Sequence, residues 1–517
     1  MVAPERPLSD DDRGGVRLLA LALAWGAAVA LAVAVVEGPL GNDEAQYAVG
    51  ARALVGGAGD DVDPYPRYRS IGMPVLSAPG ARAGEGDLAM RAPFVPFALA
   101  YLALVAWLAR RAGGGVAAAV AVAVQVSAGP WLARTGEGLS DIPSATLVLA
   151  MVALMVGGPS GARAGGPRGR RRWRGTEVAR WTGVALCGAA AIHVRYGNAP
   201  LVALVALVGL VVLRGRRGAV ALSAAGVGLL MVPFLLWSEA TTGAYLGVLR
   251  AGETAAARAY VGEGLGWYAS RWLTEVCWPV MGAMSLLGIA AGWRAWTAGA
   301  AGGRDAAADG PPVAAGVVAG PPGAAVAAGE VRRLLSAVAL GYVVAVGLVV
   351  HGEARFVFFS ASALTITGAA ALAPRLRARA QARTAAVLVL ALSTAAAGAY
   401  AVARAAHVGR GRAAMVAAAA LIRADVAAAA RGAPARCLVY TGTRPQVAWY
   451  TGCRTLLVGE VPIAPFTADG HDRVYVLSAA HQPRQPSDGA RLSAPGLVFR
   501  TLACGDGWCV WRARPPL

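Results

Sequence analysis

Long apolar runs separated by short polar segments dominate the first four hundred residues of the chain. Most of these runs are close to the length that an α-helix needs to cross the hydrocarbon core of a bilayer. They predict a mainly α fold, a polytopic bundle of about eleven transmembrane helices. The runs lie near residues 16 to 36, 92 to 109, 114 to 130, 143 to 158, 181 to 195, 198 to 213, 219 to 237, 275 to 292, 334 to 351, 356 to 373 and 384 to 404.

The pattern changes after the last of these runs. A helical stretch near residues 411 to 431 is followed by short alternating segments and turns, which are typical of strands. We therefore divide the chain into a membrane domain, residues 1 to 404, and a small extracytoplasmic α/β domain, residues 405 to 517. Within the membrane domain, residues 37 to 91 form the first outer loop. Residues 297 to 330, rich in Ala, Gly and Pro, are expected to be a disordered cytoplasmic linker.

Composition supports a membrane protein and explains the basic charge. Hydrophobic residues make up 57% of the chain and charged residues only 15%, and the formal net charge is +19. The basic residues are all Arg, and they concentrate in alternate segments between the apolar runs. This is the positive-inside pattern, which predicts a multi-pass protein of the cell (inner or plasma) membrane with its N-terminus in the cytoplasm and its C-terminal domain outside. The arginines therefore do not indicate a nucleic-acid partner.

Four of the six cysteines fall in the C-terminal domain, as expected for an oxidising compartment. Cys504 and Cys509 flank a tight turn and are placed to bridge it, which would leave Cys437 to pair with Cys453. Four cysteines allow three pairings, and a zinc site is the alternative.

The first outer loop opens with EGPLGNDEAQYAVGARALVGG directly after the first apolar run, and this segment contains two adjacent carboxylates, Asp43 and Glu44. A carboxylate close to the bilayer is costly, which favours a role as a base, an ion ligand or a partner of Arg. Residues 43 to 55 are predicted to form a short interfacial amphipathic helix. Asp43 or Asn42 is expected at its N-cap, and in the structural alternative Asp43 is only a cap.

Arginines on the outer side are candidates for binding phosphate. Arg67 and Arg69 lie in a proline-rich part of the first loop, where positive charge is not needed for topology. Guanidinium groups bind phosphate oxygens through paired hydrogen bonds. Solvated loop charge is the alternative interpretation.

Two later segments add polar groups on the same side. Asp141 precedes an apolar run, as either a helix cap or a site residue, and Arg195 either anchors at the interface by snorkelling or contacts a ligand. In the short HGEARF turn, His351, Glu353 and Arg355 lie at the membrane boundary. Glu353 and Arg355 either pair with each other or present Arg355 to a lipid phosphate.

At these residues the chain resembles the GT-C superfamily of membrane glycosyltransferases. The similarity is to the branch containing protein O-mannosyltransferases, aminoarabinose transferases and related bacterial membrane sugar transferases. It covers most of residues 15 to 375, including NDEAQYAVGARAL, the GDLAMRAPFVPFALAYLALVAWLAR segment, the loop before Asp141 and HGEARF. Many relatives carry His-Pro-Pro after the first-loop acidic pair, whereas this chain has Asp63, Pro64, Tyr65 and Pro66.

The resemblance implies a function and roles for these residues. The first-loop Asp of the family deprotonates the acceptor, a role that falls on Asp43 with Glu44 beside it. The donor would be a polyprenyl-phosphate sugar whose phosphate is held by Arg67, Arg69 and Arg355. The acceptor would be an extracytoplasmic lipid, glycan or protein.

Two other function classes remain alternatives: a transporter or flippase of lipid-linked substrates, and a non-catalytic scaffold for envelope assembly. The apolar runs contain few ionisable residues, which argues against a transport path. The sequence contains no strong cluster of metal ligands, and it leaves a requirement for a divalent cation, the sugar and the acceptor open.

Overall fold

The structure is a computed structural model. It describes residues 10–56, 70–84, 86–157, 167–248, 250, 260–300, 322–430, 436–456, 473–479, 498–505 and 507–514. The chain divides into two compact units. Unit 1 contains residues 1–31, 95–135 and 140–401, and unit 2 contains residues 32–94, 136–139 and 402–517.

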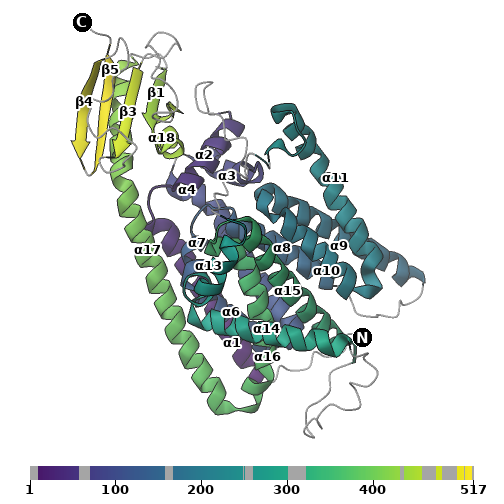
Figure 1. Ribbon diagram of the computed structural model, residues 1–517. Helices are drawn as coiled ribbons and strands as arrows, with labels where there is room; N and C mark the ends of the chain where they lie inside the picture. The colour runs from purple at the N-terminus through teal and green to yellow at the C-terminus, as the bar shows by residue number, and fades with distance from the viewer. Residues whose placement is uncertain are drawn as a thin grey trace. The chain divides into compact units, whose positions relative to one another are not determined.

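The described residues of unit 1 form helices joined by turns and short loops, with no strand among them (Figure 1). Because lipid offers no partner for backbone polar groups, apolar segments of this kind satisfy their hydrogen bonds internally as helices. Its helices are most of α1 (Asp10–Val36), α5 (Val95–Gly113), α6 (Gly115–Val126), α7 (Gly129–Thr135), α8 (Asp141–Val156), α9 (Pro167–Val194), α10 (Ala199–Val212), α11 (Arg217–Thr242), α13 (Glu263–Arg271), α14 (Trp278–Ala300), α15 (Pro322–Val349), α16 (Phe358–Ala378) and the first part of α17 (Ala380–Ala429).

Helix α16 forms the centre of unit 1, where it contacts α5, α6, α14 and α15. Small residues let these helices approach closely. A Cβ added to Gly368 would lie 2.2 Å from the backbone oxygen of Met284 on α14. Buried hydroxyls add hydrogen bonds between helices, since Ser362 donates to Gln125 Oε1 at 2.7 Å and Tyr101 donates to the Phe358 carbonyl at 3.2 Å. Such contacts replace the hydrophobic driving force that is missing between helices in lipid.

Each of the eleven predicted apolar runs coincides with a helix of the structure. The predicted number of spans is not established by this agreement. Six described helices are long and apolar enough to cross a membrane, or seven if the bent pair α6 and α7 counts as one span. Helices α8 and α10 are apolar but shorter. The protein is therefore a multi-pass membrane protein of mainly helical fold.

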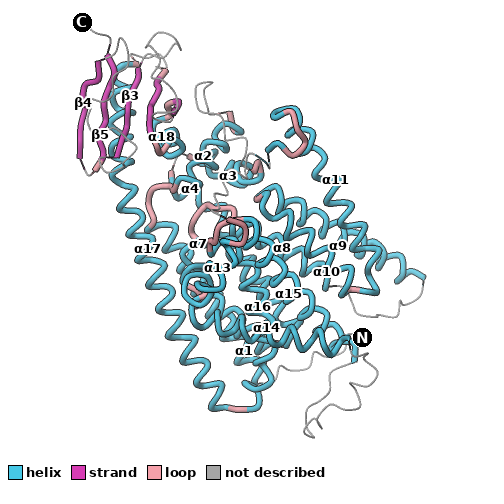
Figure 2. Tube along the Cα trace, viewed as in Figure 1, coloured by secondary structure: helices cyan, strands magenta, loops and turns pink. Residues whose placement is uncertain are grey.

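Unit 2 combines the first loop with the C-terminal part of the chain. The loop contributes α2 (Asn42–Leu54), α3 (Gly72–Ala83) and α4 (Asp87–Arg91). The C-terminal part contributes the end of α17, β1 (Cys437–Thr441), α18 (Arg444–Thr451), β2 (Arg454–Leu456), β3 (Arg473–Ala479), β4 (Val498–Gly505) and β5 (Trp508–Arg514). Figure 2 shows the strands gathered in this C-terminal part.

The strands form one mixed sheet in the order β2-β1-β3-β5-β4. Strand β1 pairs in parallel with β2 and β3, while β5 is antiparallel to β3 and β4. The end of α17 packs on one face of the sheet, with Met415 and Ile422 against Val439, Tyr475 and Val510. This arrangement agrees with the predicted small α/β fold.

Two disulfides hold the C-terminal sheet, with one of the three pairings that its four cysteines allow. Cys437 on β1 is bonded to Cys453, which directly precedes β2. Cys504 and Cys509 are bonded across the β4–β5 turn.

Helix α17 differs from the sequence-based division of the chain. The prediction separated an apolar run ending at residue 404 from a helix beginning near residue 411, whereas α17 is continuous from Ala380 to Ala429. The residues between the two are Ala, His, Val, Gly and Arg, with no proline to end the helix. The ends of the predicted linker are also helical, because α14 extends to Ala300 and α15 begins at Pro322. Residues 301–321 lie outside the described residues.

Candidate functional site

The acidic pair of the first loop lies in the first turn of α2. The predicted cap is wrong, because Gly41 is the N-cap and Asn42 is the first helical residue. Asp43 and Glu44 therefore occupy the second and third helical positions, where the helix dipole favours negative charge. Their surroundings differ, since Asp43 is partly exposed and Glu44 is buried. The helix is largely buried along its length, in contrast to the predicted interfacial helix with one exposed face.

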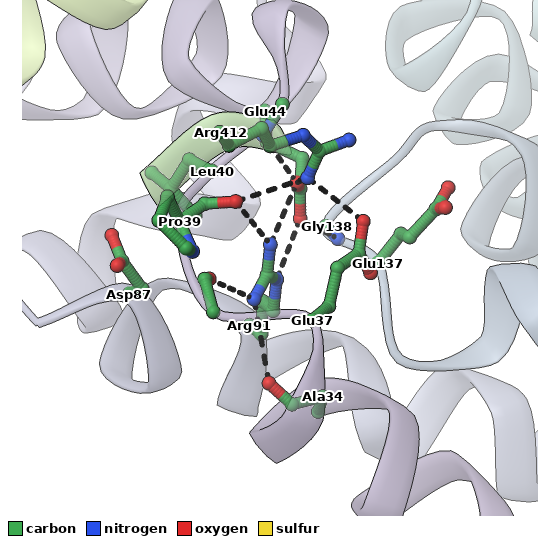
Figure 3. Close-up of polar contacts among 12 residues, drawn as sticks. Ala34, Glu37, Pro39, Leu40, Glu44, Asp87, Arg91, Glu137, Gly138 and Arg412 are labelled. Carbon is green, nitrogen blue, oxygen red and sulfur yellow. Dashed lines mark hydrogen bonds and ion pairs between the residues drawn. The ribbon is translucent and has the colours of Figure 1, made fainter. Parts of the chain in front are cut away.

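Glu44 is saturated with hydrogen-bond donors (Figure 3). Arg91 donates from Nε to Oε1 at 2.8 Å and from Nη2 to Oε2 at 2.9 Å. The backbone N–H groups of Gly41 and Gly138 donate to Oε2 and Oε1 at 2.7 and 2.8 Å. Burial alone would raise the pKa of Glu44, but Arg91 and the two N–H groups outweigh it and lower the pKa. Glu44 is therefore a permanently charged anchor, a poor candidate for accepting a proton.

Arg91, on α4, joins α2 to the end of α1. Besides its two bonds to Glu44, its Nη1 donates to the carbonyls of Gly38 and Ala34 at 2.6 and 3.3 Å, and its Nη2 to that of Pro39 at 3.3 Å. Only 1% of the Arg91 side chain is exposed. A planar guanidinium with five donors suits this buried role, which Lys would not reproduce.

Arg412, on α17, reaches the same group of residues. Its Nη1 donates to Glu37 Oε1 at 2.8 Å and to the Pro39 carbonyl at 3.0 Å, and lies 3.5 Å from Glu44 Oε2. A Cβ at Gly41 would lie 2.8 Å from Arg412 Nη2, so glycine at this cap leaves room for the guanidinium. Farther along, Arg404 donates to Glu137 Oε1 at 3.1 Å. We call Glu37, Glu44, Arg91 and Arg412 the carboxylate–arginine cluster.

Glu37 is the member of this cluster whose pKa is raised by burial. Its side chain is 1% exposed, and Oε2 has no hydrogen-bond partner among the described residues. Burial, reinforced by the charges of Glu137 and Glu44, raises the pKa of Glu37 to about 8, against the opposing effect of Arg91 and Arg412. At neutral pH the bond from Arg412 therefore reaches a mostly protonated carboxyl.

This raised pKa predicts a pH-dependent stability. Between pH 4.5, the ordinary pKa of Glu, and about pH 8, the pKa of Glu37 in the folded protein, folding takes up a proton. The stability that Glu37 contributes is therefore complete below pH 4.5 and is lost as the pH rises through 8. Glu37→Gln, which mimics the protonated form, should unfold near the wild-type temperature at about pH 5 and at a higher temperature at about pH 9. Thermal unfolding of the purified protein in detergent measures this.

The matched control is Glu275→Gln, which removes a carboxylate that is 48% exposed and paired with Arg271. It should leave the pH profile unchanged. A parallel profile for Glu37→Gln and wild type would show that Glu37 is ionised throughout this range.

A second group of predicted residues meets in unit 1, in a pocket. The pocket is lined by Asp141, Ser144, Ala145, Arg195, Asn198, Leu201, Tyr342, Arg355, Phe356 and Phe359. Asp141 begins α8 behind the N-cap Ser140, so of the two interpretations of Asp141 the helix cap is wrong. Its carboxylate is instead 1% exposed and forms an ion pair with Arg195 Nη1. Arg355 Nη1 lies 4.0 Å from its second oxygen.

The HGEARF turn contributes Arg355 and Phe356 to the lining of this pocket. Glu353 Oε1 forms an ion pair with Arg355 Nε at 2.5 Å, as the spacing of the two residues allowed, and Glu353 Oε2 lies 3.8 Å from His351 Nε2. The guanidinium of Arg195 lies over the ring of Phe356 at 4.7 Å, and that of Arg355 at 5.7 Å. Arg195 is thus held by Asp141 and Phe356 in protein contacts, unlike the snorkelling anchor that we considered.

In unit 1 the structure thus brings together five of the predicted site residues: Asp141, Arg195, His351, Glu353 and Arg355. Asp43 and Glu44 belong to unit 2. Arg67 and Arg69 lie outside the described residues. Among the residues that the structure describes, no three His, Cys, Asp or Glu side chains are grouped to hold a metal ion.

Sequence reasoning did not single out Arg91, Arg412 or Glu37. Arg91 and Glu37 carried a signal, because each is a charge next to an apolar run. Arg412 lies in an arginine-rich stretch, where nothing separates it from its neighbours.

Comparison with known proteins finds relatives by structure. No family model and no curated protein sequence matches the chain. ArnT from Cupriavidus metallidurans, solved bound to undecaprenyl phosphate, has a TM-score of 0.65 and 17% identity, covering 96% of this chain and 97% of that one. Its apo form has a TM-score of 0.64 and 16% identity, covering 98% of each.

The oligosaccharyltransferase AglB from Archaeoglobus fulgidus was solved with an inhibitory peptide and a dolichol-phosphate. It has a TM-score of 0.54 and 12% identity, covering 90% of this chain and 69% of that one. Both proteins are GT-C superfamily members. The chain therefore shares the fold of these two GT-C proteins, as its sequence resemblance predicted.

Proposed function

We propose that this protein is a membrane glycosyltransferase that moves a sugar from a polyprenyl-phosphate donor to an extracytoplasmic acceptor. The observation that carries the proposal is the pocket in which Arg195 and Arg355 share the buried carboxylate of Asp141. Two solved structures of similar fold support a polyprenyl-phosphate donor, since one is bound to undecaprenyl phosphate and the other to a dolichol-phosphate.

The pocket suits the phosphate of such a donor. Asp141 and Phe356 hold Arg195, and Asp141 and Glu353 flank Arg355, so both guanidinium groups are oriented before a ligand arrives. Side chains that are already ordered lose little conformational entropy on binding. The side chains of Arg195 and Arg355 remain 20% and 22% exposed. We assign them to the donor phosphate, with His351 and Glu353 orienting Arg355, and keep Arg67 and Arg69 as further candidates from sequence.

Asp43 is our candidate for the general base. Its neighbour Glu44 is occupied by four hydrogen bonds and held in its charged form, so it has little capacity left to accept a proton. Asp43 lies one position earlier in the same turn and is partly exposed. Arg91 and Glu44 therefore fix the backbone on which Asp43 is presented.

The proposed reaction is a single displacement. Asp43 accepts the proton of the acceptor O–H or N–H, and the acceptor atom attacks the anomeric carbon of the donor sugar. The bond between that carbon and the phosphate oxygen breaks with its electron pair, giving the glycosylated acceptor and polyprenyl phosphate. The arginines stabilise the charge that develops on the leaving phosphate, a type of electrostatic help that is worth several kcal/mol.

Purified protein, offered a panel of radiolabelled polyprenyl-phosphate sugars and membrane extract as the source of acceptors, tests the function directly. We expect one donor to yield polyprenyl phosphate together with a labelled glycosidic product. In liposomes, passage of the intact donor across the bilayer without a new glycosidic bond would show a transporter. Failure of every donor, combined with normal envelope function of Asp43→Ala cells, would favour a scaffold.

Arg355→Gln is expected to lower kcat/KM for the donor by roughly 10- to 100-fold, because a hydrogen bond to a charged group contributes about 1.5–3 kcal/mol. Initial rates over a range of donor concentrations measure it. Arg271→Gln is the matched control, because Arg271 is 50% exposed in an ion pair of the same unit. Equal kcat/KM values for Arg355→Gln and wild type would remove Arg355 from the donor site.

A further inference from the structure

Helix α18 of the C-terminal part lies against the first-loop helices inside unit 2. Its residues Ala448 and Trp449 share one buried apolar cluster with Leu40, with Ala45, Ala48, Val49 and Ala51 of α2 and with Met90 of α4, and Tyr450 packs against this cluster. The loop and the C-terminal part are more than three hundred residues apart in sequence. The contact therefore links two parts of the chain that the sequence presents as separate.

Polar contacts make this packing specific. The Tyr450 hydroxyl donates to Asp87 Oδ1 at 2.7 Å and accepts from the Leu40 backbone N–H at 2.6 Å. Arg52, near the end of α2, donates from Nη2 to the Trp449 carbonyl at 3.1 Å, and its guanidinium lies 4.1 Å from the centre of the Trp449 ring. The two residues of α18 thus contact both ends of α2, at its entry through Leu40 and in its last turn through Arg52.

Helix α4 relays the same contact to the acidic pair. Asp87 and Arg91 are the first and last residues of α4, one turn apart. Asp87 is held by Tyr450, and Arg91 holds Glu44 through two hydrogen bonds. A short rigid helix therefore connects the phenol of Tyr450 to the turn that carries Asp43.

The Cys437–Cys453 disulfide fixes α18 itself. Cys437 begins β1 and Cys453 lies two residues after the last residue of α18, so the bond closes the segment that contains the whole helix. Without the bond, the segment would be held by its packing and by short β1–β2 pairing over three residue pairs. The bond thus restricts where Trp449 and Tyr450 can lie.

We infer that α18 is a clamp that positions α2, with Tyr450 and Trp449 as positioning residues for the base. This inference rests on the proposed function for its catalytic consequence, but the clamp itself is a physical contact that can be measured without activity. The C-terminal part of the chain would then contribute to catalysis through α2 and α4, without touching the reacting atoms.

Hydrogen–deuterium exchange of the purified full-length protein tests the clamp. Tyr450→Phe keeps the ring and removes the two hydrogen bonds, so it should fold and still show faster exchange in residues 42–54 and 87–91. Strands β1 and β3 should keep wild-type exchange, which verifies folding of the sheet. Cys437→Ser/Cys453→Ser should show the same local increase, whereas the matched pair Cys504→Ser/Cys509→Ser should not. Unchanged exchange of α2 in both Tyr450→Phe and Arg52→Ala would overturn the clamp.

Transfer kinetics test its catalytic consequence. Tyr450→Phe is expected to lower kcat by roughly 10- to 100-fold while KM for the donor stays within about twofold, because small misplacement of a reacting group costs rate without weakening substrate binding. Arg52→Lys, which keeps the charge, should recover part of the rate lost in Arg52→Ala. If the wild-type protein turns over no donor, the proposed function is wrong, and hydrogen–deuterium exchange alone decides whether α18 positions α2. If a variant has a normal kcat although its α2 exchanges faster, α18 stabilises α2 but does not position the base for catalysis.

Discussion

Asp43→Asn is expected to lower the rate of sugar transfer by roughly 100- to 10,000-fold, the usual contribution of a general base. Asn has nearly the same shape as Asp but cannot accept the acceptor proton at neutral pH. Because Asp43 is partly exposed and Glu44 keeps its own partners, the change should not disturb the fold. The loss of one charge from the first helical turn costs only about 0.3–1 kcal/mol.

The measurement is single-turnover transfer with the donor identified in the panel. Donor binding should be close to wild type, so the deficit should appear in kcat. Asn42→Ala, which changes the exposed preceding residue of the same turn, is the matched control and should retain activity. A fully active Asp43→Asn protein, stably inserted in the membrane, would exclude Asp43 as the base and leave the arginine pocket as the part of the proposal still standing.

The helices of the membrane part could be predicted because lipid leaves the backbone few choices. An apolar run such as residues 356 to 373 must satisfy its polar groups internally, and α16 is found there. The number of spans could not be predicted as securely, since helices such as α8 and α10 are apolar but shorter than the others. The small α/β fold near the C-terminus was also predicted, because strands and turns have local signals.

The sequence could not predict which segments of the chain pack together in unit 2. Tyr450 bonds to Asp87 and Arg412 to Glu37, pairs that are separated by 363 and 375 residues. Neither local propensity nor hydrophobic period carries information about partners so far apart. The helix caps considered at Asp43 and Asp141 are also wrong. Asp43 and Asp141 both have the residue type and position of a helix cap, yet each lies inside its helix, and a distant arginine binds Asp141.

The acidic pair also shows how adjacent residues of one charge acquire different roles. From sequence, Asp43 and Glu44 are adjacent carboxylates of the first loop, and only the resemblance to the GT-C superfamily assigned the role of base to Asp43. In the structure the longer side chain of Glu44 accepts from Arg91 and from two backbone N–H groups, which lowers its pKa. Asp43, one position earlier in the turn, keeps partial exposure. Environment rather than residue type thus separates the anchor from the candidate base.

Arg91→Met is expected to produce the largest loss of stability, about 3–5 kcal/mol, because it leaves the buried charge of Glu44 poorly compensated. Glu44 would keep its two N–H donors, and Arg412 at 3.5 Å would be its nearest remaining cation in the carboxylate–arginine cluster. The carbonyls of Ala34 and Gly38 would also lose the donor that Arg91 supplies, while that of Pro39 would keep Arg412. Denaturant titration of the purified protein in detergent measures the change in the free energy of unfolding.

Two further variants separate the buried pair from a general effect of losing arginine. Arg91→Met/Glu44→Gln removes the uncompensated charge and should recover part of the stability, because the penalty arises from burying one charge alone. Arg271→Met breaks an exposed ion pair and should cost no more than about 1 kcal/mol. If Arg91→Met unfolds like Arg271→Met, Glu44 is not buried as described, and the anchor that presents Asp43 must be sought among other contacts of α2.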